Sequence, residues 1–155
     1  MKTTELIATN LHQVYFGGNW TASNLKTALE DVTLNMASKQ VYEFNTILTL
    51  TYHIHYYLKG TLDAINTGEL TIRDKYSFDH PNLETEDDWQ AFLNTIWEEA
   101  KTFIDMIKSL DDTILDTYLA QEKYGKYHRN LLGIIEHTHY HLGQIVIIKK
   151  LLRLI

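Results

Sequence analysis

The amino-acid sequence predicts an all-α protein, a four-helix bundle, and three observations support this fold class. Four segments carry apolar side chains at alternating steps of three and four residues, which places those side chains on one face of an α-helix. No stretch sustains the two-residue alternation of a half-buried strand. The helical segments are long and follow one another along the chain, an order typical of packed helices around one core.

The first helical segment spans residues 2–16 and is followed by two glycines, the usual signal that ends a helix. Its inward-facing stripe is Ile7, Leu11, Val14 and Tyr15. Residues 24–39 predict one or two short helical turns. Their inward-facing residues are Leu25, Leu29, Val32 and Met36.

The second long helix is predicted to begin near Asn45, a favourable N-cap, and to end at Gly68. Its stripe is Phe44, Leu48, Thr51, His55, Leu58, Leu62 and Ile65. The connection that follows, residues 69–82, holds the only proline of the chain and is expected to be exposed.

The third long helix is predicted to start at Thr85, because Asp88 three residues later completes a pair that resembles a capping box. Its stripe is Trp89, Leu93, Ile96, Ala100, Phe103, Ile107 and Leu110. A shorter helical piece is expected at 113–120, and the last helix at roughly 129–154. The stripe of this last helix is Asn130, Ile134, His137, His141, Gln144, Ile148, Leu151 and Ile155.

The composition of the chain limits the kinds of protein to which it can belong. The 155 residues fit a single domain, 1–155, with no cysteine and a formal net charge of −6. The acidic balance disfavours a nucleic-acid partner, and no apolar run approaches the roughly 20 residues that a bilayer span needs. These features, with no signal-peptide pattern, predict a cytoplasmic protein. Apolar residues on more than one face of several helices suggest a homodimer.

Histidines interrupt the apolar stripe of the last helix and indicate a metal site. His137 and His141 are four residues apart and therefore lie on one helix face, whereas His139 points to the other side. Buried imidazoles are costly unless their nitrogens are satisfied, and a divalent cation satisfies them. The alternative is a pair of packed histidines bonded to tyrosines or carbonyls.

The second long helix offers a third ligand, because it carries His53 and His55 in an apolar setting. Periodicity favours His55, which lies on the stripe, while His53 lies at its edge. Three histidines with an open fourth position are typical of a catalytic metal site, whereas structural sites are usually closed by four protein ligands.

Two segments resemble the DinB-like superfamily of metalloenzymes, also called YfiT-related. They are "NTILTLTYHI" (45–54) and "IIEHTHYHLGQIVIIKKLL" (134–152), and the most specific part is the H-x-x-x-H-x-G-Q-I pattern. The resemblance covers nearly the whole chain and implies a four-helix bundle with long connections. It also implies His53, His137 and His141 as metal ligands, with water on the open side. Members of the family include transferases that depend on low-molecular-weight thiols such as bacillithiol or mycothiol, as well as isomerases and hydrolases.

Residues near the histidines suggest further roles. Gln144 either orients a ligand or satisfies a backbone group. Gly133 and Gly143 each destabilise a helix by about 1 kcal/mol relative to alanine. The close approach of a neighbouring helix or a substrate would explain why glycine is present at these positions. Arg129 and the segment 74–76 are candidates for binding an anionic group. The tyrosines expected to flank the site are Tyr52, Tyr56, Tyr57 and Tyr140.

The sequence therefore supports two hypotheses about function. The first is a metal-dependent transferase or hydrolase that uses zinc, nickel or iron and acts on a small molecule, such as a low-molecular-weight thiol. The second is a non-catalytic helical binding or dimerisation module, with a structural metal or none. No general base is evident, since neither Glu43 nor Glu136 is placed convincingly.

Overall fold

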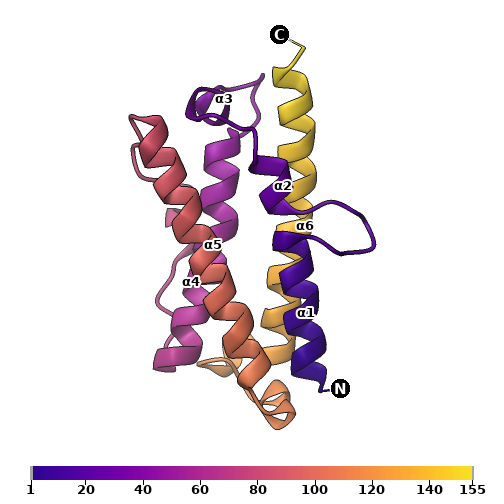
Figure 1. Ribbon diagram of the computed structural model, residues 1–155. Helices are drawn as coiled ribbons and strands as arrows, with labels where there is room; N and C mark the ends of the chain where they lie inside the picture. Colours follow the sequence, from indigo (N-terminus) through magenta and orange to yellow (C-terminus); the bar gives the residue numbers. More distant parts are fainter. Residues whose placement is uncertain (1, 155) are drawn as a thin grey trace.

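The computed structural model describes residues 2–154 and is all-helical, which confirms the predicted class (Figure 1). The described chain forms six α-helices and three short 3-10 helices. It contains no strand, only an isolated antiparallel bridge between Tyr118 and Lys126. Met1 and Ile155, the last position of the predicted stripe, lie outside the described residues.

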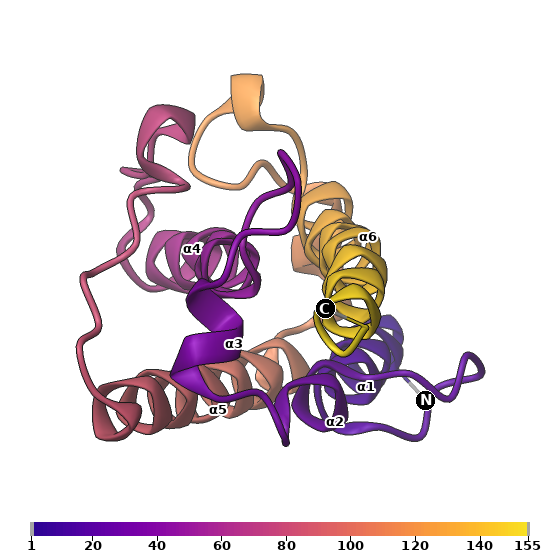
Figure 2. The ribbon, with the colours of Figure 1, turned by 90° about the horizontal axis from the view of Figure 1, so that it is seen from above.

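The four longest helices run side by side along the molecule. They are α1 (Thr3–Phe16), α4 (Ile47–Thr67), α5 (Glu86–Ser109) and α6 (Tyr127–Leu152). Helix α1 packs on α5 and α6, and α4 packs on the same two helices (Figure 2). Each long helix therefore has two neighbours, and α4 presents one face to α5 and another to α6.

Two short helices lie between α1 and α4, as predicted for residues 24–39. They are α2 (Leu25–Leu29), which contacts α1 and α6, and α3 (Leu34–Ser38), which contacts α4. Asn24 and Thr33 cap them, each accepting a hydrogen bond from a backbone N–H of the first turn.

Most helix ends match the local sequence signals. Thr85 caps α5 and forms the capping box with Asp88. Gly68 ends α4 in the left-handed conformation, at a φ of 77°. The N-cap of α4 is Thr46 rather than Asn45, and its side chain accepts a hydrogen bond from the Thr49 N–H.

Two connections differ from the expectation. The piece predicted at 113–120 is a 3-10 helix, η2 (Asp112–Asp116), and a second one, η3 (Glu122–Tyr124), precedes α6. The connection 69–82 contains η1 (Asp74–Tyr76) and is not wholly exposed, because Ser77 is buried. This connection lies closely on α4, where a Cβ on Gly60 would come 2.5 Å from the Ile72 side chain.

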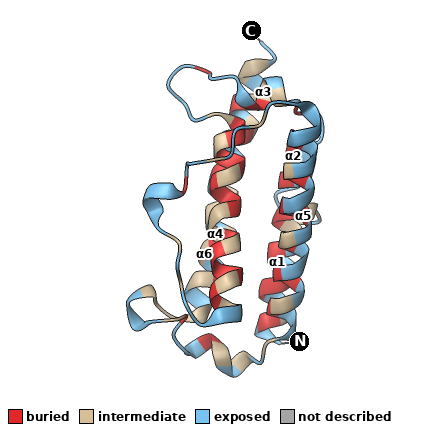
Figure 3. Cartoon of the chain, turned by 90° about the vertical axis from the view of Figure 1, so that its left-hand side faces the viewer, coloured by how far each residue is buried: buried red, intermediate tan, exposed pale blue. Residues whose placement is uncertain are grey.

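The core follows the predicted stripes, and buried positions run the length of the long helices (Figure 3). Helix α5 buries every predicted position up to Ile107. Phe44 is an exception on the α4 stripe, since it precedes the helix and is 51% exposed. Among residues 2–154, no helix combines the length and the apolar character of a membrane span.

Candidate metal centre

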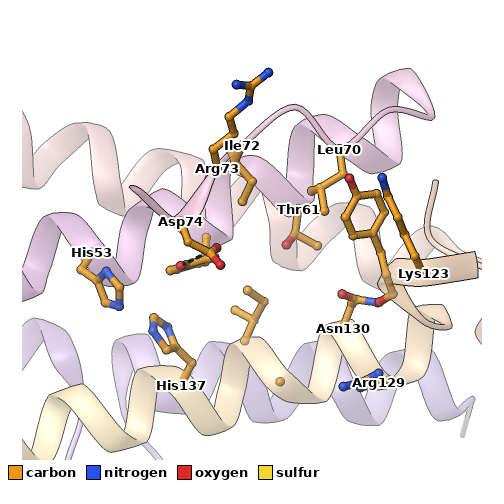
Figure 4. Close-up of a pocket in the computed structure, with 14 residues that line it drawn as sticks. His53, Thr61, Leu70, Ile72, Arg73, Asp74, Lys123, Arg129, Asn130 and His137 are labelled. Atoms are coloured by element: carbon orange, nitrogen blue, oxygen red, sulfur yellow. Dashed lines mark hydrogen bonds between the residues drawn. The ribbon is translucent and has the colours of Figure 1, made fainter. Parts of the chain in front are cut away.

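Three histidines from two helices meet where α4 faces α6. His53 lies on α4, His137 and His141 lie on α6, and their ligand nitrogens are all within 4.8 Å of one another. The ring centroids are 4.8 Å apart for His53 with either partner and 4.5 Å apart for His137 with His141. His53 and His141 are buried, and His137 is partly exposed. Figure 4 shows His53 and His137 pointing toward each other across the gap between the helices.

Helix geometry explains why these residues meet. His137 and His141 are one turn apart on the face of α6 that packs on α4. His53 lies on a second buried face of α4, together with Tyr57 and Thr61 at steps of four. The predicted stripe described only the first buried face of α4.

His55, which periodicity favoured, lies outside the cluster. Its Nε2 is 2.7 Å from a carboxylate oxygen of Glu99 on α5, so the side chain faces the opposite neighbour of α4. Its Nδ1 is buried without a hydrogen-bond partner. His139 is half-buried on the side of α6 away from the cluster, as expected from its position.

The ring of His53 is fixed by the connection 69–82. Its Nδ1 lies 3.1 Å from the carbonyl oxygen of Ser77, and because a carbonyl only accepts, Nδ1 must carry the proton. The lone pair of His53 is therefore on Nε2. Phe78 stacks on the same ring at a centroid distance of 4.0 Å and an interplanar angle of 6°. This segment was predicted to be an exposed connection, and its contacts with His53 could not be seen in the sequence.

The ring of His141 is fixed from its own helix. Its Nδ1 donates to the Gln144 side-chain oxygen at 2.7 Å, which again leaves Nε2 as the nitrogen with the free lone pair. Of the two roles considered for Gln144, the structure supports orientation of a site residue. Partners of this kind, bonded to the far nitrogen of a histidine, are usual around protein metal ions.

The electrostatic surroundings keep all three imidazoles neutral near pH 7. Burial lowers the pKa of His137 to about 4, and the neighbouring His141 and His53 add to the effect. Burial is also the main cause that lowers the pKa of His53 and of His141. A neutral imidazole has the lone pair that a metal requires.

The three side chains fit a divalent transition metal. An ion bound tetrahedrally at 2.0–2.1 Å holds its nitrogens about 3.3 Å apart, and the observed ligand nitrogens all lie within 4.8 Å of one another. Imidazole suits zinc, nickel and iron, so the donor set does not favour magnesium or calcium. Three protein ligands leave at least one coordination position for another molecule.

A cleft of about 650 Å³ opens beside the histidines between α4, α6 and the connection 69–82. His53 and His137 line one end of it (Figure 4). Next to them the Tyr57 hydroxyl donates to the Asp74 carboxylate at 3.0 Å. The volume is in the range of small-molecule sites.

The structure also shows which of the other candidate residues from the sequence line the cleft. Arg129 and Asp74 line the cleft. No atom lies within 4 Å of a Cβ built on Gly133 or on Gly143, so close approach of a neighbouring helix does not explain either glycine. Gly133 instead lines the cleft, where a side chain would take up space.

Of the four tyrosines expected near the site, two contact the histidine cluster and two contact the connection 69–82. Tyr57 packs edge-on against His53 and His137, and Tyr140 packs edge-on against His141. Tyr56 holds the connection 69–82 instead, because its hydroxyl donates to the carbonyl of Arg73 and accepts from its N–H. Tyr52 lies beside Tyr56 and His80.

Comparisons with family models, with curated proteins and with solved structures find no match for this chain.

Proposed function

We propose that this chain is a metal-dependent enzyme with a DinB-like four-helix-bundle fold that acts on a small molecule. The observation that carries the proposal is the preorganised histidine cluster at the end of a cleft. Two of its rings are held through Nδ1 so that Nε2 is free, and all three ligand nitrogens lie within 4.8 Å. A cluster that only stabilised the fold would not need an adjacent cleft of about 650 Å³.

A bound zinc, nickel or iron ion would lower the pKa of water or of a substrate thiol and so supply a nucleophile near neutral pH. The metal would be held by His53, His137 and His141. The reaction class is transfer to or from a low-molecular-weight thiol, or hydrolysis.

Asp74 is the candidate proton acceptor that the sequence did not reveal. Its carboxylate lies in the cleft and accepts a hydrogen bond from the Tyr57 hydroxyl at 3.0 Å. Its negative charge partly opposes the fall in the pKa of His53 that burial causes. Tyr57 packs edge-on against both His53 and His137, at centroid distances of 5.1 and 5.0 Å. A carboxylate held beside the metal ligands is well placed to take a proton from a substrate.

The metal content of the purified, untagged protein tests this proposal. Elemental mass spectrometry should find about one transition-metal ion per chain, as expected for a single three-histidine site. His53→Ala and His137→Ala should each abolish stoichiometric metal.

Two matched variants serve as controls for the loss of a histidine. His139→Ala removes an imidazole from the same helix outside the cluster, and His55→Leu removes one from α4 while filling its buried space. Both should keep the metal. Wild-type protein that takes up no zinc, nickel or iron on reconstitution would refute the enzyme proposal and leave a non-catalytic helical module.

A further inference from the structure

The end of the cleft away from the histidines is basic. Lys123 and Arg129 line this end, whereas Arg73 and the acidic residue Asp74 lie toward the histidine end. This balance is opposite to that of the whole chain, whose formal net charge is −6. Positive charge concentrated in a concave site of an acidic protein attracts anionic ligands.

Two of these cations have no acidic partner among residues 2–154. Neither Lys123 nor Arg129 takes part in any ion pair of the described chain, whereas the nearby Lys126 pairs with Asp116 at 3.1 Å. Arg129 also lies in the first turn of α6, where the helix dipole makes a positive charge unfavourable. Helix stability therefore does not explain the charge of Arg129.

The backbone that carries these cations is firmly held. Asn130 donates to the carbonyls of Tyr124 and Lys126 at 3.0 and 2.8 Å, which fixes the loop before α6 on its first turn. Gly125, at a φ of 81°, leaves room for the Arg129 side chain, whose Cδ would lie 3.1 Å from a Cβ at this position. The Lys123 ammonium lies 4.8 Å from the ring centre of Tyr124. Both side chains are exposed and line this end of the cleft.

We propose that Lys123 and Arg129 form a subsite for a carboxylate or phosphate group of the substrate. Arg129 precedes His137 by eight residues on α6, a separation of about 12 Å along the helix axis. The substrate class is thus an elongated anionic small molecule whose reacting atom lies about 10 Å or more from its acidic group. This span rests on the proposed function, since it takes the histidine cluster as the reacting end.

The side-chain Nε–H signals of the chain's three arginines allow a direct test by ¹⁵N NMR. Inorganic phosphate and succinate are titrated separately into zinc-free protein, with chloride at matched ionic strength as the control. The Arg129 signal should shift and saturate. The Arg73 signal should not, because that side chain extends away from the cleft (Figure 4), nor should that of Arg153, which pairs with Asp31. The tighter of the two probes identifies the acidic group.

Substitutions at Lys123 and Arg73 test whether the anion binds at the proposed subsite. Lys123→Gln should lower the affinity for the anion that binds by roughly ten-fold, as expected for loss of one charge-assisted contact. Arg73→Gln should leave this affinity unchanged. Absence of a saturable shift at Arg129, or an equal shift at Arg73, would overturn the subsite. Anion binding at Arg129 in a protein that takes up no metal would refute the proposed function and leave the subsite standing.

The distance between the histidine cluster and the anion subsite is tested on zinc-loaded protein. The ligands are mercaptooctanoate, its neutral amide and the short acid mercaptopropionate. The long acid should bind about ten-fold more tightly than its amide, and Arg129→Gln should remove this difference. The short acid should show no effect of Arg129→Gln. Equal affinity of the long acid and its amide would overturn the span.

Discussion

At the scale of single residues, Gln144 is the most informative position outside the three histidines. Its oxygen accepts the Nδ1 proton of His141 at 2.7 Å and so selects the tautomer with Nε2 free. Gln144→Leu should weaken zinc binding by roughly 10- to 100-fold with little change in the fold, as found for partners of metal-bound histidines. Competition with a chromogenic chelator measures this affinity.

The matched variant is Gln144→Glu, which keeps an acceptor at the same distance along the side chain. It should retain wild-type affinity or exceed it, because a carboxylate is the stronger acceptor. Equal zinc affinity of the leucine and glutamate variants would show that the hydrogen bond does not organise the site.

The choice between His53 and His55 shows what residue patterns can and cannot predict. Periodicity identified one buried face of α4, and His55 is indeed buried on it against Glu99. A helix that packs on two neighbours has two buried faces, and a single stripe cannot tell which of them faces α6. The resemblance indicated His53, the residue that the structure places beside His137 and His141.

At the scale of elements, the connection 69–82 depends on Gly60 for its place on α4. A Cβ on Gly60 would lie 2.5–2.9 Å from three side-chain atoms of Ile72. Gly60→Ala should therefore push the connection outward, at a cost of about 1–3 kcal/mol in the free energy of unfolding. It should also weaken zinc binding, because the Ser77 carbonyl that holds His53 belongs to the same connection.

Ile72→Ala offers the matched test of this explanation. In the Gly60→Ala/Ile72→Ala double variant the clash is gone, so zinc affinity should recover relative to Gly60→Ala alone. A double-mutant cycle on urea unfolding measures the coupling between the two positions. Additive effects would show that the close approach of Ile72 is not the reason for the glycine.

Helix α1 depends on a cap from a distant part of the chain. Asp112 accepts hydrogen bonds from the N–H groups of Thr3 and Thr4 at 2.8 and 2.9 Å. The bond from the Thr4 N–H, followed by that from Thr3, lowers the pKa of Asp112 from 3.8 to about 2. Because the folded-state pKa is depressed, the stabilisation is present above pH 4 and is lost as the pH falls through 2.

Thermal unfolding of Asp112→Asn tests this cap. The variant should melt a few degrees below wild type at neutral pH, and the difference should vanish near pH 2. Asp105→Asn, on an exposed position of α5, makes the same change in net charge and is the control. A difference between Asp112→Asn and wild type that does not depend on pH would exclude the ionised carboxylate as its source.

Elements defined by side-chain periodicity were predictable, and elements defined by distant contacts were not. The stripes and caps located the four long helices to within a few residues. The buried Ser77 and the cleft-lining Asp74 lie in a segment with no period, and they are placed by Tyr56 and Gly60 of α4. No local pattern in 69–82 encodes those contacts.

At the scale of the whole molecule, the metal site joins parts of the chain that are far apart. His53 and His137 are separated by 84 positions, and no disulfide links any part of this cysteine-free chain. An ion held by both helices binds the folded chain and not the unfolded one. Zinc at a thousand-fold excess over its dissociation constant should therefore add about 4 kcal/mol to the free energy of unfolding.

For a chain of this length that gain corresponds to a rise of roughly 8–16 °C in Tm. Differential scanning calorimetry of zinc-free and zinc-loaded protein measures the rise, which should grow with the logarithm of free zinc. The His53→Ala/His137→Ala double variant should show almost none of it, because a single remaining imidazole cannot join α4 to α6. An equal rise in the double variant would place the bound zinc elsewhere on the molecule and would remove the link between metal binding and the packing of these two helices.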